Sequence, residues 1–414
     1  AQDSLWAGYG SKLAACASPA TAASLAGCFS APESIGIDKI SAVTTDGVNV
    51  YFATLKNGGW SCPIAGLGTN CTHIMAGAWP SGENVKSLAA ADGMLWIGQN
   101  DGEIYRCAAN IPYASQSTMP DGCVLLDDAE TRSVDSLLLA NGRLYAGLAA
   151  SALNEKSQGI LWSCDPQAVN SCENLDYYGT TVALSLAAGG GYLWAGLDNG
   201  IIWRCNLDTA NHCDNWEKAG GRIDSVSYDG RGTLYAAVEV SNGVIWSCPT
   251  ASANGCSTVL SNVAGSSVAA GAGGVFSSTT AGLYFGASAF TAASDTLDGA
   301  DLLYVPARGM SGVGDVAVTV RGGKWTERLG KRCASGGGSP KATVRVTGPH
   351  GLDKTQVVNL CRLQAGGSVK KTFTMLDPGA YTVTARTKKV GGSGSFTVEK
   401  DRTGKVTVRM TRAG

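Results

Sequence analysis

The sequence predicts an all-β protein, a seven-bladed β-propeller followed by a C-terminal β-sandwich. Three observations carry this prediction: a repeat of 41 to 49 residues, cysteines spaced in pairs, and a late change to short alternating strands. The composition agrees, because 56 Gly and only 12 Pro among 414 residues fit many tight turns between short strands. No apolar run approaches the roughly 18 residues that a membrane span needs.

The repeat is clearest in Ser87–Cys107 and Ser185–Cys205, which align without a gap. The same frame recurs, with small insertions, in Ser41–Cys62, Ser136–Cys164 and Ser225–Cys248. Each unit predicts four strands: one from the Ser, one carrying Leu-Trp-Ala-Gly or Leu-Tyr-Ala-Gly, one ending in aromatic-x-Cys, and one from the partner Cys. Asn-Gly or Asp-Gly turns mark the hairpin between the second and third strands. Four strands at this spacing are typical of a propeller blade.

The blade count follows from the aromatic residue of the second strand. It occurs seven times, at Trp6, Tyr51, Trp96, Tyr145, Trp194, Tyr235 and Phe276. The first unit lacks its own first strand, and Asp301–Val305 resembles the start of the Ser136 unit. We therefore expect Asp301–Val305 to close the ring in a blade built from both ends of residues 1–307. The last strand of the seventh blade is expected around Ser288–Leu297, and a six-bladed ring with two spare strands is the alternative.

Fourteen cysteines give seven predicted disulfides. The pairs are Cys16/Cys28, Cys62/Cys71, Cys107/Cys123, Cys164/Cys172, Cys205/Cys213, Cys248/Cys256 and Cys333/Cys361. Zinc sites usually show two-residue gaps with His nearby, whereas the chain has no such gap and only three His, so no metal is expected. Each close pair would staple the two outer strands of a blade, where backbone is otherwise exposed.

Disulfides at this density predict an oxidising compartment and a secreted protein. Because the chain starts at Ala1 without a Met or an apolar leader, we expect that a signal peptide has been removed. Asn70-Cys71-Thr72 is an N-glycosylation sequon, although a bridged Cys71 would hinder modification of Asn70.

The pattern changes at about Arg308. Residues 308–414 contain six or seven short segments that alternate apolar and polar residues, such as Ala342–Val346 and Tyr381–Ala385, separated by Gly, Pro and Asp turns. We predict a basic immunoglobulin-like or prealbumin-like sandwich in which the Cys333/Cys361 pair pins two strands or a loop.

Charge separates the two parts. About 20 of the 32 Lys and Arg follow residue 300, against about 7 of the 33 Asp and Glu. The C-terminal part is therefore near +13 and the propeller near −14, although the whole chain carries −1. Such asymmetry indicates electrostatic partnering with the chain's own propeller, with another copy or with an acidic polysaccharide; a solvated basic face is the simpler explanation. Nucleic acid is not expected for a secreted protein.

Residues for catalysis are scarce. His73, His212 and His350 fall in turns or beside disulfides, so we expect neither a Ser-His-Asp triad nor a metal site nor a cofactor. Asp135 and Asp224 occupy equivalent positions before the repeated Ser, where carboxylates could bind a ligand or form a glycosidase pair. Asp and Ser at strand starts also cap turns, which is the structural explanation. We predict a protein that is not an enzyme.

Aromatic residues offer a second kind of binding site. Those of the repeated aromatic-x-Cys position could stack on sugars or pack between blades, and packing is the prediction. Trp79 and Trp216 fall outside the repeat, which makes them better candidates for ligand binding. The Ser residues of the repeat are expected to hydrogen-bond between adjacent innermost strands.

The repeat resembles secreted, cysteine-paired propellers, and its Ala/Gly-rich style is similar to extracellular proteins of green algae. The Asp-box and Trp-Asp signatures of other propellers are missing, so no site residue transfers. We expect a structural or interaction protein of a matrix, cell wall or surface appendage that assembles through its acidic propeller and basic sandwich. A lectin-like glycan-binding propeller is the alternative, and a polysaccharide hydrolase or lyase comes third.

Overall fold

The computed structural model contains two compact units. Unit 1 comprises Ala1–Ala187, Leu193–Cys205 and Asn211–Met310, and unit 2 comprises Ala188–Tyr192, Asn206–Ala210 and Ser311–Gly414. The structure describes residues 4–412 except 10–11, 18–27, 31–38, 56–57, 67–69, 75–83, 110–121, 131, 150–158, 178–180, 208–212, 241–242, 262–264, 272–273, 280–281, 287–290, 295–300, 306–313, 322–332, 334–339, 350–351, 378, 388–389 and 400–401. Among these residues, no helix is long and apolar enough to cross a membrane.

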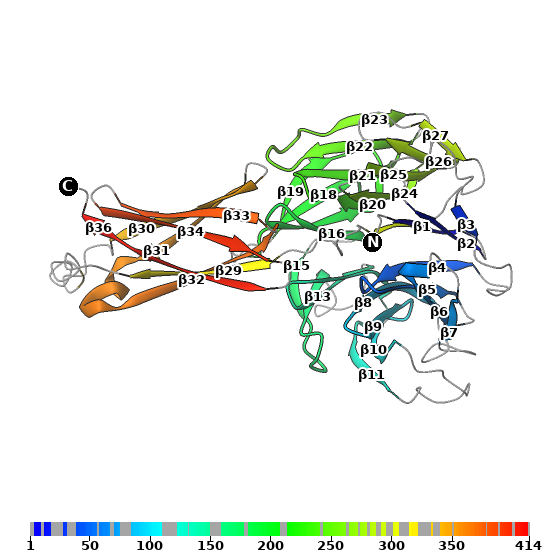
Figure 1. The fold of residues 1–414 in the computed structure, drawn as a ribbon, viewed down its shortest axis with the longest axis horizontal. Coiled ribbons are helices and arrows are strands. Elements are labelled where there is room, and N and C mark those ends of the chain that lie inside the picture. The colour runs from blue at the N-terminus through cyan, green and yellow to red at the C-terminus, as the bar shows by residue number, and fades with distance from the viewer. Residues whose placement is uncertain are drawn as a thin grey trace. The chain divides into compact units, whose positions relative to one another are not determined.

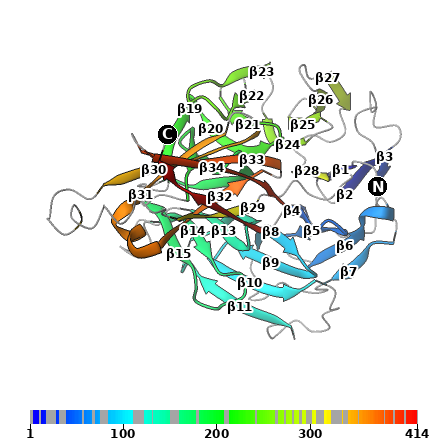
Figure 2. The same cartoon turned by 60° about the vertical axis from the view of Figure 1, so that its left-hand side comes forward.

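Unit 1 is all-β and propeller-like, because four-stranded antiparallel sheets repeat along it (Figure 1). Within the described residues there are seven such sheets, which we call blades. Six are continuous in sequence: β4 (Ile40–Thr45), β5 (Asn49–Thr54), β6 (Gly59–Pro63), β7 (Thr72–Ile74); β8 (Val85–Ala91), β9 (Met94–Gln99), β10 (Glu103–Ala108), β11 (Cys123–Asp128); β12 (Val134–Ala140), β13 (Arg143–Leu148), β14 (Gly159–Cys164), β15 (Glu173–Tyr177); β16 (Ala183–Gly189), β17 (Tyr192–Leu197), β18 (Ile201–Cys205), β19 (Cys213–Lys218); β20 (Arg222–Tyr228), β21 (Thr233–Glu239), β22 (Val244–Pro249), β23 (Ser257–Ser261); and β24 (Gly265–Gly271), β25 (Gly274–Thr279), β26 (Gly282–Gly286), β27 (Thr291–Ser294). Figure 2 shows several of these sheets turned by 60°.

The seventh blade joins the two ends of unit 1. Its strands are β28 (Asp301–Val305), β1 (Ser4–Tyr9), β2 (Lys12–Ala17) and β3 (Cys28–Ser30). β28 pairs antiparallel with β1, with Ser4 opposite Val305. The predicted return of Asp301–Val305 to complete the first blade is thus confirmed. β28 also contacts β24 on one side and β4 on the other, so the innermost strands of the first and last blades meet.

Apolar residues of neighbouring blades share one core. One cluster unites Trp96 and Leu126 of the β8–β11 blade with Ala146 and Trp162 of the β12–β15 blade. Similar clusters join the β4–β7 blade to the β8–β11 blade, and the β20–β23 blade to the β24–β27 blade. Each blade thus buries its faces against the next, which is why a single repeat cannot fold alone.

Small residues in the second strand make this packing possible. A Cβ added to Gly98 in β9 would lie only 2.6 Å from Val134 Cγ1, which belongs to the first strand of the next blade. The same relation joins Gly8 to Ile40, Gly147 to Ala183 and Gly196 to Ile223. Glycine at this repeat position therefore leaves room for the first strand of the following blade to pack against the second strand.

Serines of the repeat link innermost strands, as predicted. Ser87 Oγ donates to the Val134 carbonyl at 2.7 Å, and Ser185 Oγ accepts from the Val226 N–H at 3.0 Å. Further links are Ser136 to the Ala183 carbonyl and Ser225 to Val268. Ser41 is the exception, because its Oγ donates to the Ala53 carbonyl of its own blade.

Unit 2 contains two sheets. The three-stranded sheet has the order β32 (Ser368–Leu376), β29 (Gly314–Arg321), β35 (Thr403–Arg409), and the five-stranded sheet has the order β31 (Asp353–Asn359), β30 (Lys341–Thr347), β33 (Gly379–Arg386), β34 (Val390–Val398), β36 (Thr411–Arg412). Val318, Val344, Phe373, Val383 and Val408 from both sheets form one buried core. β29 and β35 run parallel, which the sequence did not predict.

The open edge of β32 is protected by side chains of β31. Lys354 Nζ donates to the Thr374 carbonyl at 3.0 Å, and Gln356 Nε2 donates to the Thr372 carbonyl at 2.6 Å. These bonds occupy carbonyls that an edge strand would otherwise offer to another chain.

Candidate functional site

The first strand of the blades begins with a β-bulge. The register shifts leave one extra residue between paired positions in five blades, at Ser41, Lys86, Asp135, Asp224 and Ser266. A bulge redirects the side chain of its extra residue away from the regular alternation of the strand. Polar residues thus recur at one end of the innermost strands, and Asp135 and Asp224 occupy equivalent places, as the repeat predicted.

Asp224 lies beside two charged residues of its own blade. Arg222 Nε is 2.7 Å from Asp224 Oδ1, and Arg222 Nη1 is 3.9 Å from Glu239 Oε2. Burial raises the pKa of Asp224 from 3.8 to about 6; Arg222 lowers this pKa and Glu239 raises it. The carboxyl therefore changes its charge in mildly acidic solution.

Asp135 responds to charges that come from three other blades. Ser133 Oγ donates to Asp135 Oδ1 at 2.8 Å. Burial raises the pKa of Asp135, while Ser133, Lys86 and Arg222 lower it and Asp198 raises it. Lys86, Asp198 and Arg222 belong to the blades that begin at β8, β16 and β20. Charges from several blades therefore lie near this end of the innermost strands. We call it the charged ring.

The two acids of the charged ring have different partners in their own blades. Asp224 is paired with Arg222, whereas Asp135 accepts a hydrogen bond from Ser133. The described residues also contain no group of three His, Cys, Asp or Glu able to hold a metal ion. The ring can interact with a polar ligand of either charge sign.

Of the two predicted aromatic binding residues, the structure describes only Trp216. The prediction is wrong for Trp216, whose side chain is only 1% exposed and packs edge-on against Trp194, with ring centroids 4.9 Å apart. It lies on β19 facing the core, so no ring face is free for a sugar. Trp79 lies outside the described residues. At the aromatic-x-Cys position, Tyr105, Trp162 and Trp203 are buried, as the packing interpretation predicted, whereas Trp60 and Trp246 are half-buried.

Six of the seven predicted cysteine pairs are present as disulfides. They are Cys62–Cys71, Cys107–Cys123, Cys164–Cys172, Cys205–Cys213, Cys248–Cys256 and Cys333–Cys361. Cys16 and Cys28 are opposite each other in the pairing of β2 with β3, and their side chains are outside the described set. The blade disulfides join the two outer strands, with Cα atoms 3.9 to 4.2 Å apart.

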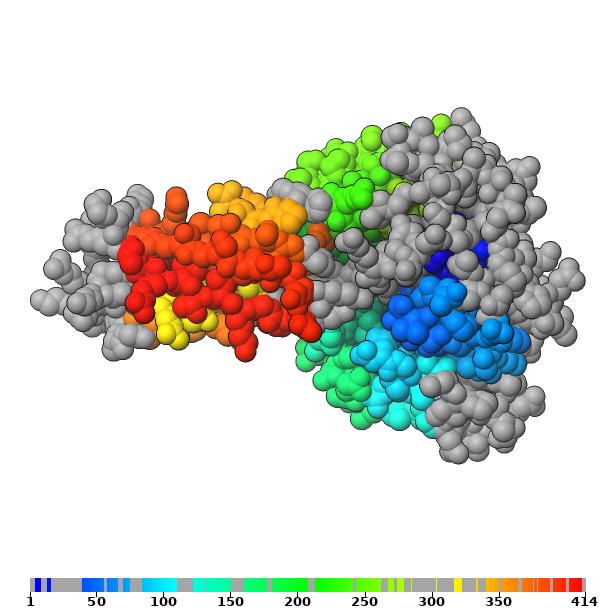
Figure 3. All heavy atoms as spheres, viewed as in Figure 1, coloured from blue at the N-terminus to red at the C-terminus, as the bar shows by residue number. Residues whose placement is uncertain are grey.

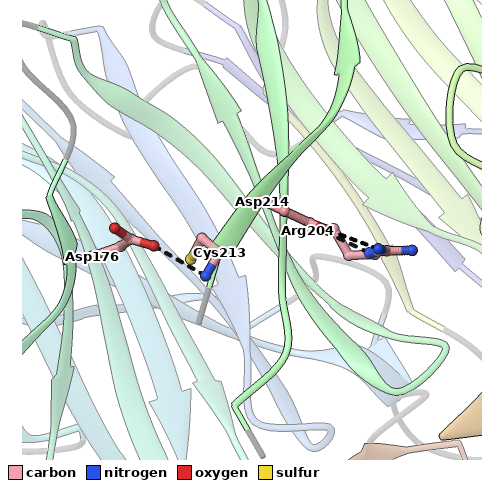
Figure 4. Close-up of polar contacts among 4 residues, drawn as sticks. All are labelled: Asp176, Arg204, Cys213 and Asp214. Carbon is pink, nitrogen blue, oxygen red and sulfur yellow. Dashed lines mark hydrogen bonds and ion pairs between the residues drawn. The ribbon is translucent and has the colours of Figure 1, made fainter. Parts of the chain in front are cut away.

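A carboxylate links each of three disulfides to the preceding blade. Asp176 Oδ2 accepts from the Cys213 N–H at 3.0 Å (Figure 4). Asp127 Oδ2 accepts from Cys172 at 2.9 Å, and Glu217 Oε2 from Cys256 at 3.3 Å. We call these contacts carboxylate latches. The sequence did not predict these contacts, although an acid recurs near the end of the outermost strand in all three blades.

The sequon residue lies in the turn before β7. Asn70 is exposed and has a positive φ of 61°, and Cys71 is bridged to Cys62. Exposure leaves the side chain accessible in the folded chain, while the disulfide holds the middle residue of the sequon.

Unit 2 carries a basic surface on its three-stranded sheet. Exposed residues of its outward face include Arg321, Lys370, Lys405 and Arg409, which we call the basic face. Arg321 is directly opposite Arg409 in the parallel pairing of β29 with β35. The described residues from β29 to β36 run from yellow through orange to red in Figure 3.

No protein-family model matches the sequence, and no curated protein matches it. Three solved structures have similar folds. A chain of a nidogen/laminin complex is 8% identical, with 73% of this chain and 98% of that chain covered and a TM-score of 0.45. A chain of a mitotic checkpoint complex is 12% identical, with 67% and 84% covered and a TM-score of 0.48. The computationally designed protein Ika8 is 13% identical, with 72% and 86% covered and a TM-score of 0.44. The propeller-like fold of unit 1 therefore rests on its own strand pairing.

Proposed function

We propose that this protein is a secreted structural or interaction protein whose copies associate through an acidic seven-bladed propeller and a basic immunoglobulin-like sandwich. A component of an extracellular matrix, cell wall or surface appendage would have this role. The observation that carries the proposal is the segregation of charge, near −14 up to residue 300 and near +13 after it. Opposite charges of this size attract over a Debye length, about 10 Å at 0.1 M salt.

The architecture in this proposal is supported by contacts of the described residues. Seven four-stranded sheets and the pairing of β28 with β1 favour seven blades over six. The two sheets of unit 2 share one core, as in a sandwich. Five disulfides between the outer strands of blades favour an oxidising, extracellular location.

A non-catalytic role is part of the proposal. The carboxyls of Asp135 and Asp224 each interact with a different partner, which favours a structural or binding role over a shared catalytic one. Burial of Trp216 also removes a principal argument for a lectin-like propeller.

Sedimentation of the full chain tests the proposal. We expect association at about 0.1 M salt and monomers at about 1 M, where the Debye length falls to about 3 Å. A chain ending at Val305 keeps β28 but lacks the basic strands, so it should be monomeric at both concentrations. A full chain that is monomeric at both would contradict the proposal.

A further inference from the structure

The basic face is a strongly cationic surface that the described strands of unit 2 assemble in register. Lys370 is opposite Thr319, and Thr319 is opposite Thr407. In the next row Ser368, Arg321 and Arg409 are neighbours across the three strands. On the other side of the Thr319 row, Lys405 is opposite Ala317. Cations therefore alternate with small hydroxyl side chains on a sheet whose strands are about 4.8 Å apart.

No acidic partner of the four cations is found among the side chains that the structure describes. No ion pair or side-chain hydrogen bond joins Arg321, Lys370, Lys405 or Arg409 to another residue in the described part of the chain. On the outward face of the other sheet, by contrast, Arg345 forms an ion pair with Asp353. Like charges directly opposite each other, as at Arg321 and Arg409, destabilise a sheet. An anionic partner would remove this repulsion.

We infer that the basic face docks on the acidic propeller of a second copy of this chain. This inference rests on the proposed self-association and assigns its surface. The partner is argued from charge complementarity, since the propeller carries a net charge near −14. The basic face places Ser and Thr side chains between its cations, so its described residues present a polar, positively charged surface.

One carboxylate latch gathers exposed acids on the propeller. Asp127 of β11 bonds the Cys172 N–H, which brings the end of β11 beside the start of β15. Asp128 and Glu130 follow Asp127, and Glu173 follows Cys172; all three are exposed. We call this group the acidic rim and assign it as the surface that receives the basic face.

A pair of matched variants tests the basic face in the full chain. Arg321→Thr with Arg409→Thr removes two cations from the basic face, and Arg345→Thr with Arg386→Thr removes two from the other sheet. The first should weaken low-salt association by about tenfold, whereas the second should change it less than about twofold. If both double variants weaken low-salt association equally, the inference is wrong, and the net charge of the chain accounts for the association.

A charge-swap experiment tests the partner surface. Arg321→Glu with Arg409→Glu, and separately Glu130→Lys with Glu173→Lys, should each abolish low-salt association. Mixing the two variants should restore it, because each then offers the charge that the other lacks. If Glu130→Lys with Glu173→Lys associates as the wild type does, the acidic rim is not the surface that receives the basic face. Circular dichroism checks that each variant folds.

Wild-type behaviour separates this inference from the proposed function. If the wild type associates and the Arg321/Arg409 variants associate equally well, the inference fails and the proposed function stands. If the wild type is monomeric at low salt, the proposed function fails. Retention of such a monomer on immobilised heparin, lost in Arg321→Thr with Arg409→Thr, would show that the basic face binds a polyanion and overturn the second copy as its partner.

Discussion

The carboxylate of Asp176 accepts a 3.0 Å hydrogen bond from the backbone N–H of Cys213, so the outermost strand of one blade holds the disulfide of the next. Asp127 and Glu217 repeat this contact at Cys172 and Cys256. The outer edge of each of these three blades is thus held by a disulfide within the blade and by a hydrogen bond from its backbone to a carboxylate of the preceding blade.

Replacing Asp176 by Ala should destabilise unit 1. A hydrogen bond to a charged group contributes about 1.5 to 3 kcal/mol, and the change also leaves the Cys213 N–H without its acceptor. The free energy of unfolding in urea measures the loss. Asp214→Ala is the control, because its exposed ion pair with Arg204 should contribute less than about 1 kcal/mol. Equal losses in the two variants would show that the latch adds nothing.

Replacing Gly98 by Ala should loosen the contact between two blades. The added methyl group would lie 2.5 Å from Ser87 Oγ and 2.6 Å from Val134 Cγ1, so these neighbouring side chains must shift. Overpacking of this kind costs about 1 to 3 kcal/mol. Gly220→Ala is the matched control, because nothing lies within 4 Å of its added Cβ. Thermal unfolding of both variants gives the comparison, and an unchanged midpoint for Gly98→Ala would contradict the packing argument.

The pH dependence of stability should carry the signature of Asp224. Its pKa rises from 3.8 to about 6 in the folded chain, chiefly through burial, so the folded state binds this proton more tightly than the unfolded state. Stability therefore falls as the pH rises from about 4 to 6, and the loss is complete above the folded pKa.

Asp224→Asn removes this titration. The variant should gain stability relative to the wild type between pH 4 and 7, measured as the urea midpoint at each pH. Asp214→Asn serves as the control, since Asp214 is exposed and should produce no such gain. If the urea midpoints of Asp224→Asn and the wild type differ by the same amount at every pH from 4 to 7, the pKa of Asp224 does not lie in this range.

The short disulfides should each stabilise the fold measurably. Cys164→Ala with Cys172→Ala opens a bridge between residues 8 positions apart, which costs about 2 to 3 kcal/mol in the chain-entropy model. Urea unfolding without reductant measures the loss in the full chain. With dithiothreitol present, the free energies of unfolding of the variant and the wild type should differ less, because the wild type then also lacks the bridge. If the difference stays the same, the loss of stability comes from lost packing at Cys164.

Much of unit 1 could be predicted because the same residue types recur at equivalent positions of several repeat units. The Ser residues, the paired Cys and the return of Asp301–Val305 all follow from aligning units. The alignment failed at Ser41, because β4 and β5 are joined by a longer turn than β8 and β9, which shifts the frame by one residue. Ala42 therefore occupies the place of Ser87 opposite the second strand.

Side-chain environments were harder to predict than strands. Trp216 lies outside the repeated aromatic position, yet the alternation of β19 turns it to the core. The latch acids could not be recognised from one unit, because their partners are backbone groups of the following blade. The parallel pairing of β29 with β35 depends on how distant segments meet, which local patterns do not encode.

The pairing of β28 with β1 also sets the order in which the chain can fold during synthesis. β1, β2 and β3 leave the ribosome before the other six blades of unit 1, yet their sheet lacks its innermost strand until Asp301–Val305 has been made. The intervening six blades can assemble one after another, because their strands are contiguous in sequence. Within unit 1, the blade whose strands are made first is therefore the last to complete its sheet, and the inner edge of β1 lacks its partner strand until then.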